Sequence, residues 1–121
     1  MKKERIIEFM RLLGKQPFTT MQDEKDEHYF MVYPPIGSDV AVVAAFRGMS
    51  FRRPLGYISA TLDEEQCVIN EYDFTDQAMA HGIDKQMLQI MKGVCQDHKW
   101  TARISEDLPS EVQTLLMEFV W

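Results

Sequence analysis

Cysteine is scarce in this chain of 121 residues, which contains only Cys67 and Cys95. Small secreted domains that depend on disulfides carry several cysteine pairs, so this content does not indicate a disulfide framework. A reducing, cytoplasmic environment is therefore the expected location.

Long hydrophobic runs are missing as well. No stretch approaches the roughly 18 apolar residues that a membrane helix needs. Charged residues also interrupt the N-terminal segment MKKERIIEFMRLLGKQ, where a signal peptide would have its apolar region. We expect no membrane partner.

Positive charge is in the minority, with 13 Lys and Arg against 19 Asp and Glu and a formal net charge of −6. Binding to nucleic acid or anionic lipid over a whole surface requires a dominant positive field. The charge balance therefore argues against nucleic acid as the main partner, although it leaves room for a local basic patch.

Signatures of catalysis and metal binding are absent from the sequence. It contains no Walker loop, GxGxxG, HExxH, GxSxG or EF-hand loop. Cys95 and His98 have the i, i+3 spacing that could bring both to one metal ion, but Cys95 also continues an apolar helix stripe. We expect no metal, no cofactor and no catalytic residues, and an enzyme is the less favoured interpretation.

Alternating and helical patterns fill most of the chain. Four segments rich in β-branched and aromatic residues are predicted antiparallel strands, and a fifth segment is a candidate edge strand. These segments are residues 28–33, 39–47, 55–62 and 66–74, with the edge strand at 99–104. In the fourth segment, strict alternation places Cys67, Ile69 and Glu71 on the face opposite Tyr72.

Helical spacing predicts three helical regions. An amphipathic helix covers residues 3–15, and a helix or helix pair follows the fourth strand, with Thr75 or Asp73 as N-cap and Asp84 as a second N-cap. A C-terminal amphipathic helix covers residues 107–121. Together these elements predict a single α+β domain over residues 1–121, with helices on one face of an antiparallel sheet of about four to five strands.

A basic loop stands out against the acidic background. In AFRGMSFRRPLGYIS, three arginines fall within seven positions, between the second and third predicted strands. Arginine next to Met and aromatic residues is typical of interface cores. The predicted partner-binding residues are Arg47, Met49, Phe51, Arg52 and Arg53. The alternative is that these arginines pair with carboxylates of the chain itself, at Asp63, Glu64, Glu65 or Glu71.

The C-terminal helix is the second candidate contact surface. Its apolar residues must be covered, because exposed apolar area costs roughly 25 cal/mol per Å². Packing on the chain's own sheet is the favoured interpretation, and a homodimer is the alternative. The oligomer contact would then consist of Leu115, Leu116, Phe119 and Trp121.

These features favour a small acidic protein-binding module of inhibitor, adaptor, immunity or chaperone type, whose partner is a protein with an acidic surface. In composition the chain is similar to secretion chaperones, toxin-immunity proteins and phage or plasmid inhibitor proteins, a similarity that assigns no site residues. One alternative is a small-ligand binder or small enzyme with a pocket between sheet and helices. That pocket would be lined by Tyr29, Tyr33, Tyr57, Tyr72 and His81. A second alternative is weak nucleic-acid contact through the basic loop 47–53.

Overall fold

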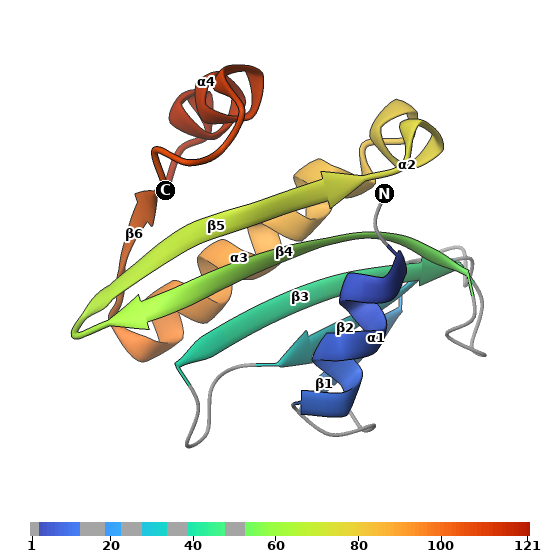
Figure 1. The fold of residues 1–121 in the computed structure, drawn as a ribbon, viewed down its shortest axis with the longest axis horizontal. Helices are drawn as coiled ribbons and strands as arrows, with labels where there is room; N and C mark the ends of the chain where they lie inside the picture. Colours follow the sequence, from blue (N-terminus) through green and yellow to red (C-terminus); the bar gives the residue numbers. More distant parts are fainter. Residues whose placement is uncertain (1–2, 13–18, 23–27, 34–38, 48–52) are drawn as a thin grey trace.

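The computed structural model describes residues 3–12, 19–22, 28–33, 39–47 and 53–121, and it confirms the α+β class (Figure 1). The elements are, in chain order, α1 (Lys3–Leu12), β1 (Thr19–Gln22), β2 (His28–Tyr33), β3 (Val40–Arg47), β4 (Pro54–Asp63), β5 (Gln66–Phe74), α2 (Asp76–Ala80), α3 (Ile83–His98), β6 (Thr101–Ile104) and α4 (Ser110–Glu118).

The strands form one mixed sheet in which the spatial order follows the sequence from β1 to β6. Each neighbouring pair from β1 to β5 is antiparallel, whereas β6 runs parallel to β5. The expected antiparallel sheet of four to five strands is therefore wrong in its count and in the direction of its last strand. The reason is that α3 carries the chain back to the start of β5, so that β6 enters the sheet in the same direction as β5.

The two long helices next to the sheet lie on opposite faces, with α1 on one side and α3 on the other (Figure 1). The expectation that all helices share one face is thus wrong. The face under α3 holds a large apolar cluster that includes Val43, Ile58 and Ile69 from the strands and Met87 and Met91 from α3. α4 joins the same cluster at the β6 edge of the sheet, where Leu116 is fully buried.

Local sequence signals account for the helix ends. The Thr75 hydroxyl accepts a hydrogen bond from the backbone N–H of Ala78 at 3.2 Å, which confirms Thr75 as the N-cap of α2. α3 begins after Gly82, not at Asp84, because Gly82 adopts a left-handed conformation with φ of 71° that separates α2 from α3. Among the described helices, none combines the length and the apolar composition needed to span a lipid bilayer.

Candidate functional site

The exposed side chains of Arg47 and Arg53, which we call the basic end, lie where the β3–β4 connection leaves the sheet. Arg47 is the last residue of β3 and Arg53 directly precedes β4. The backbone N–H of Arg47 donates to the carbonyl of Arg53 at 3.0 Å, so the two residues are held next to each other. Both residues are exposed. Two guanidinium groups on one hairpin end suit carboxylates or phosphates of a binding partner.

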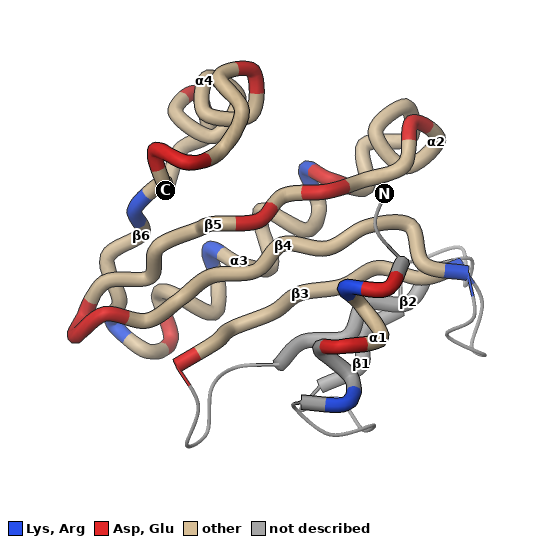
Figure 2. The backbone as a smooth tube through the Cα atoms, viewed as in Figure 1, with Lys and Arg blue, Asp and Glu red and all other residues tan. Residues whose placement is uncertain are grey.

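The carboxylates proposed as internal partners of these arginines lie elsewhere. Asp63, Glu64 and Glu65 form the β4–β5 turn, which we call the acidic turn, and β4 separates this turn from the basic end (Figure 2). Glu71 is bound by Arg5 of α1. Within the part of the chain that the structure describes, neither Arg47 nor Arg53 forms an ion pair. Met49, Phe51 and Arg52, the other predicted partner-binding residues, lie outside the described residues.

A bulge in β5 changes which residues face α1. Ser59 pairs with Glu71 and the next residue, Ala60, pairs with Ile69, so that Asn70 is an extra residue in β5. Asn70 and Glu71 consequently point to the same face, toward α1, and Tyr72 points to the face under α3. The expectation from strict alternation, with Glu71 on the face of Cys67 and Ile69, is wrong because a one-residue insertion reverses every side chain beyond it.

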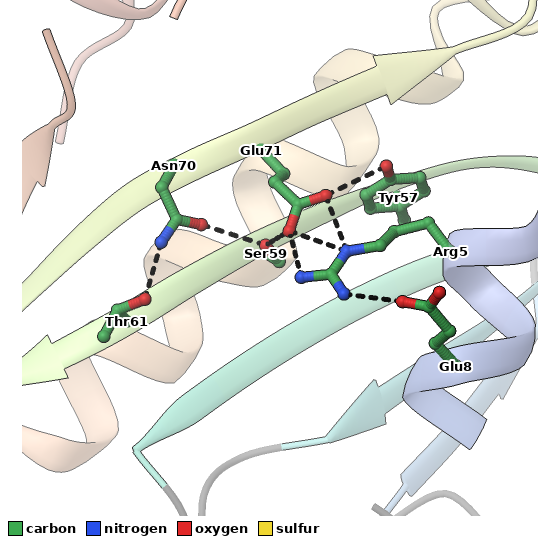
Figure 3. Close-up of polar contacts among 7 residues, drawn as sticks. All are labelled: Arg5, Glu8, Tyr57, Ser59, Thr61, Asn70 and Glu71. Carbon is green, nitrogen blue, oxygen red and sulfur yellow. Dashed lines mark hydrogen bonds and ion pairs between the residues drawn. The ribbon is translucent and has the colours of Figure 1, made fainter. Parts of the chain in front are cut away.

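The bulge assembles a polar network on the α1 face (Figure 3). The Glu71 carboxylate accepts hydrogen bonds from Arg5 Nε at 3.0 Å and Nη2 at 2.7 Å, and from the Tyr57 hydroxyl at 3.1 Å. The Ser59 hydroxyl lies 3.0 Å from Asn70 Oδ1 and 3.1 Å from Glu71 Oε1, and its one proton serves either acceptor. The seven residues of this network are Arg5, Glu8, Tyr57, Ser59, Thr61, Asn70 and Glu71.

The electrostatics of the network hold Glu71 in its charged form. Partial burial acts to raise the pKa of Glu71, but the hydrogen bonds from Arg5 and Tyr57 and the positive charge of Arg5 outweigh burial and lower that pKa. Burial and the negative charge of Glu71 raise the pKa of Tyr57. The side chains of Arg5 and Glu71 are 41% and 27% exposed, so solvent weakens their ion pair.

This arrangement suits a structural role better than a catalytic one. A carboxylate with a lowered pKa and a bidentate arginine is a weak base. Among the described residues, the hydrogen-bond acceptors next to the Ser59 hydroxyl are Asn70 and Glu71, both of low basicity, so no activating base is found there. The network instead ties α1 to β4 and β5. The sequence contained one signal for it, the two consecutive polar residues Asn70 and Glu71 within a predicted strand.

Of the tyrosines proposed to line a pocket, the two whose side chains the structure describes lie on opposite faces of the sheet. Tyr57 belongs to the polar network on the α1 face, whereas the Tyr72 hydroxyl donates to Asp84 of α3 at 2.6 Å on the other face. Burial and this hydrogen bond raise the pKa of Tyr72. His81 is exposed between α2 and α3. The side chains of Tyr29 and Tyr33 lie outside the described part of the structure.

The candidate metal pair also separates in the structure. Cys95 is buried and faces Cys67 of β5, whose thiol pKa is raised by the hydrogen bond with Cys95 and by burial. His98 is exposed, and its ring stacks on Trp100 with ring centroids 4.3 Å apart. Its Nδ1 lies 3.0 Å from the carbonyl of Val94. Cys95 therefore contributes to the core, and His98 covers the indole ring at the C-terminal end of α3.

The four residues proposed as an oligomer contact have different surroundings. Leu116 is 0% exposed within its own chain. Leu115, Phe119 and Trp121 are half-buried against the core, and the Trp121 indole N–H donates to the Leu116 carbonyl at 3.3 Å. Leu115 and Phe119 also line an open groove of about 490 Å³ between α3 and α4. We call it the α3–α4 groove; its lining residues are Lys85, Gln86, Leu88, Gln89, Leu115, Glu118 and Phe119.

In comparisons with known proteins, no protein-family model, curated protein or solved structure matches the chain.

Proposed function

We propose that this protein is a small protein-binding module, of inhibitor, adaptor, immunity or chaperone type, that binds an acidic surface of another protein through its basic end. The observation that carries the proposal is the state of Arg47 and Arg53. Both are exposed and held together by a backbone hydrogen bond, and neither has a carboxylate partner in the described part of the chain.

Charge supports the choice of partner. A guanidinium group binds carboxylates in a bidentate manner, and two such groups on one hairpin end can engage neighbouring Asp or Glu side chains. The whole chain has a net charge of −6, so a phosphate backbone would be repelled by most of its surface. An acidic patch on a folded protein needs to approach only the basic end.

The test is affinity capture from the native lysate with three baits in parallel: the wild-type chain, an Arg47→Ala/Arg53→Ala variant and a Lys92→Ala/Arg103→Ala variant. The last is the matched control, because it removes the same number of cations from α3 and β6. We expect a stoichiometric protein partner with the wild type and the control, and a loss on the order of tenfold with the Arg47/Arg53 variant.

Two further outcomes would redirect the proposal. A capture that disappears after nuclease treatment would favour nucleic-acid contact through the basic loop. If none of the three baits retains a protein partner, a small-ligand binder becomes the better hypothesis. Added salt should weaken the expected complex, since exposed charge pairs are screened beyond about 8 Å at physiological ionic strength.

A further inference from the structure

The α3–α4 groove combines an apolar floor with a charged rim. The apolar lining residues are Leu88 of α3, Leu115 of α4 and Phe119, which directly follows α4. Leu88 is 1% exposed, so the accessible apolar surface comes from Leu115 and Phe119. Leu115 and Phe119 are only half-buried, so part of their surface is in contact with water. An apolar strip of this kind between two helices is a suitable surface for association, since covering it removes apolar area from water.

The rim carries opposite charges on its two sides. Lys85 lies on the α3 side and Glu118 on the α4 side, and both residues are exposed. Within the described residues, neither Lys85 nor Glu118 takes part in an ion pair. Gln86 and Gln89 add amide groups on the α3 side, and each amide can both donate and accept hydrogen bonds.

We propose that the α3–α4 groove is the surface through which two copies of this chain associate as a two-fold dimer. A two-fold axis along the groove places the α3 side of each copy against the α4 side of the other. Lys85 of one copy then faces Glu118 of the second copy, and the same pair forms a second time by symmetry. A rim with one cation and one anion on opposite sides is complementary to itself in this arrangement, which is why a second copy is the occupant.

The expected dimer depends on concentration. Stable homodimers bury roughly 1,200–2,000 Å² in total, and a single groove supplies a small apolar centre for such an interface. The proposal is independent of the proposed function, because the groove and the basic end use different residues on different elements.

Charge reversal tests the pairing directly. A Lys85→Glu variant has a rim with two acidic groups, and a Glu118→Lys variant has a rim with two basic groups. We expect each variant alone to self-associate at least about tenfold more weakly than the wild type, because both symmetric pairs become like-charged. An equimolar mixture of the two variants should form a heterodimer, because both pairs are then restored. Sedimentation equilibrium over a concentration series measures all four samples.

The control is an equimolar mixture of Lys92→Glu and Glu106→Lys variants, which change the same charges outside the groove and should each dimerise like the wild type. Far-UV circular dichroism verifies that every variant is folded. A wild-type chain that stays monomeric at all concentrations would overturn the proposal. Wild-type-like dimers of the single variants, or a mixture that stays monomeric, would overturn it equally.

Discussion

The face of the sheet under α3 is covered by apolar side chains, whereas the face under α1 carries the polar network of β4 and β5. On the α3 face, residues such as Ile58, Ile69 and Met91 are 0% exposed and fill the space between sheet and helix. On the α1 face, Glu71 remains partly exposed and is held by hydrogen bonds from Arg5 and Tyr57. The first face depends on close packing of apolar side chains. The second combines directed polar contacts with the buried apolar side chains of Val42, Ala44 and Phe46.

This difference bears on where the protein can bind other molecules. The polar groups in the network under α1 satisfy one another, and Tyr57 and Tyr72, which a shared pocket would require on one side, point to opposite faces. The candidate contact surfaces therefore lie at the periphery of the sheet, at the basic end and in the α3–α4 groove. Such an arrangement is consistent with the proposed function, the binding of a protein partner at the basic end.

The largest expected effect is on the apolar face. Met91→Ala removes a fully buried side chain from the cluster under α3 and should lower the free energy of unfolding by about 2–5 kcal/mol, because it leaves a cavity. Urea denaturation followed by circular dichroism measures the change. Met79→Ala is the matched control, since Met79 is 45% exposed on α2 and its loss should change stability by less than about 0.5 kcal/mol.

A glycine tests how tightly the same face is packed. A Cβ atom added at Gly56 would overlap the Phe74 ring and lie 2.8 Å from the carbonyl oxygen of Asp73. Gly56→Ala should therefore destabilise the fold by roughly 1–3 kcal/mol. Gly93→Ala should have the opposite sign and stabilise by about 0.5–1 kcal/mol, because Gly93 is helical and has open space around its Cα. Thermal unfolding of both variants measures the sign of each change in stability. Two changes of the same sign would contradict this account of packing.

Removing one tyrosine hydroxyl group from each face of the sheet compares the two faces directly. The Tyr72 hydroxyl is a hydrogen-bond donor to Asp84, a residue 4% exposed whose Oδ1 has no partner among the described residues. Tyr72→Phe removes the hydrogen bond to this buried carboxylate and should lower the free energy of unfolding by about 1–3 kcal/mol. Tyr57→Phe should cost less, about 0.5–1 kcal/mol, because Glu71 keeps its contacts with Arg5 and Ser59. Chemical denaturation of both variants shows which substitution lowers the free energy of unfolding more. A larger loss for Tyr57→Phe than for Tyr72→Phe would contradict this expectation.

The polar face should also respond to pH. In the folded protein, the pKa of Glu71 lies below its ordinary value of 4.5. The stability that this carboxylate contributes is therefore fully present above pH 4.5 and is lost as the pH falls through the lowered value. Glu71→Gln should cost roughly 1–2 kcal/mol at neutral pH and less under acid conditions, because the contacts with Arg5 are partly exposed.

Unfolding free energies measured along a pH series test this expectation. The control is Glu65→Gln in the exposed acidic turn, which should follow the wild-type pH dependence. A cost of Glu71→Gln that stays constant from neutral to acid pH would contradict the role assigned to the Arg5–Glu71 pair.

The sequence predicted the parts of the fold that depend on local patterns. Met87 and Met91 recur at helical spacing and indeed form the buried side of α3, and Thr75 caps α2 as expected. The direction of β6 was not predicted, because it depends on the path of α3 across the sheet and not on the strand's own residues. The bulge at Asn70 was not predicted, because strict alternation assigns consecutive residues to opposite faces and makes no allowance for an inserted residue.

The candidate sites also differ in whether a local sequence pattern indicates them. Arg47 and Arg53 lie close in the sequence, and the register of one hairpin suffices to bring them together. The Arg5–Glu71 pair joins residues 66 positions apart, and no local spacing indicates it. The α3–α4 groove depends on how α4 packs next to α3, which periodicity alone does not determine.

The central claim is that the basic end, and not the acidic turn, meets a protein partner. Quantitative capture with an Arg47→Glu/Arg53→Glu bait and an Asp63→Lys/Glu65→Lys bait, each compared with the wild type, tests it most directly. We expect the first bait to lose the partner and the second to keep it. Retention of the partner by the first bait, together with its loss by the second, would contradict the claim and assign the contact to the opposite end of the sheet.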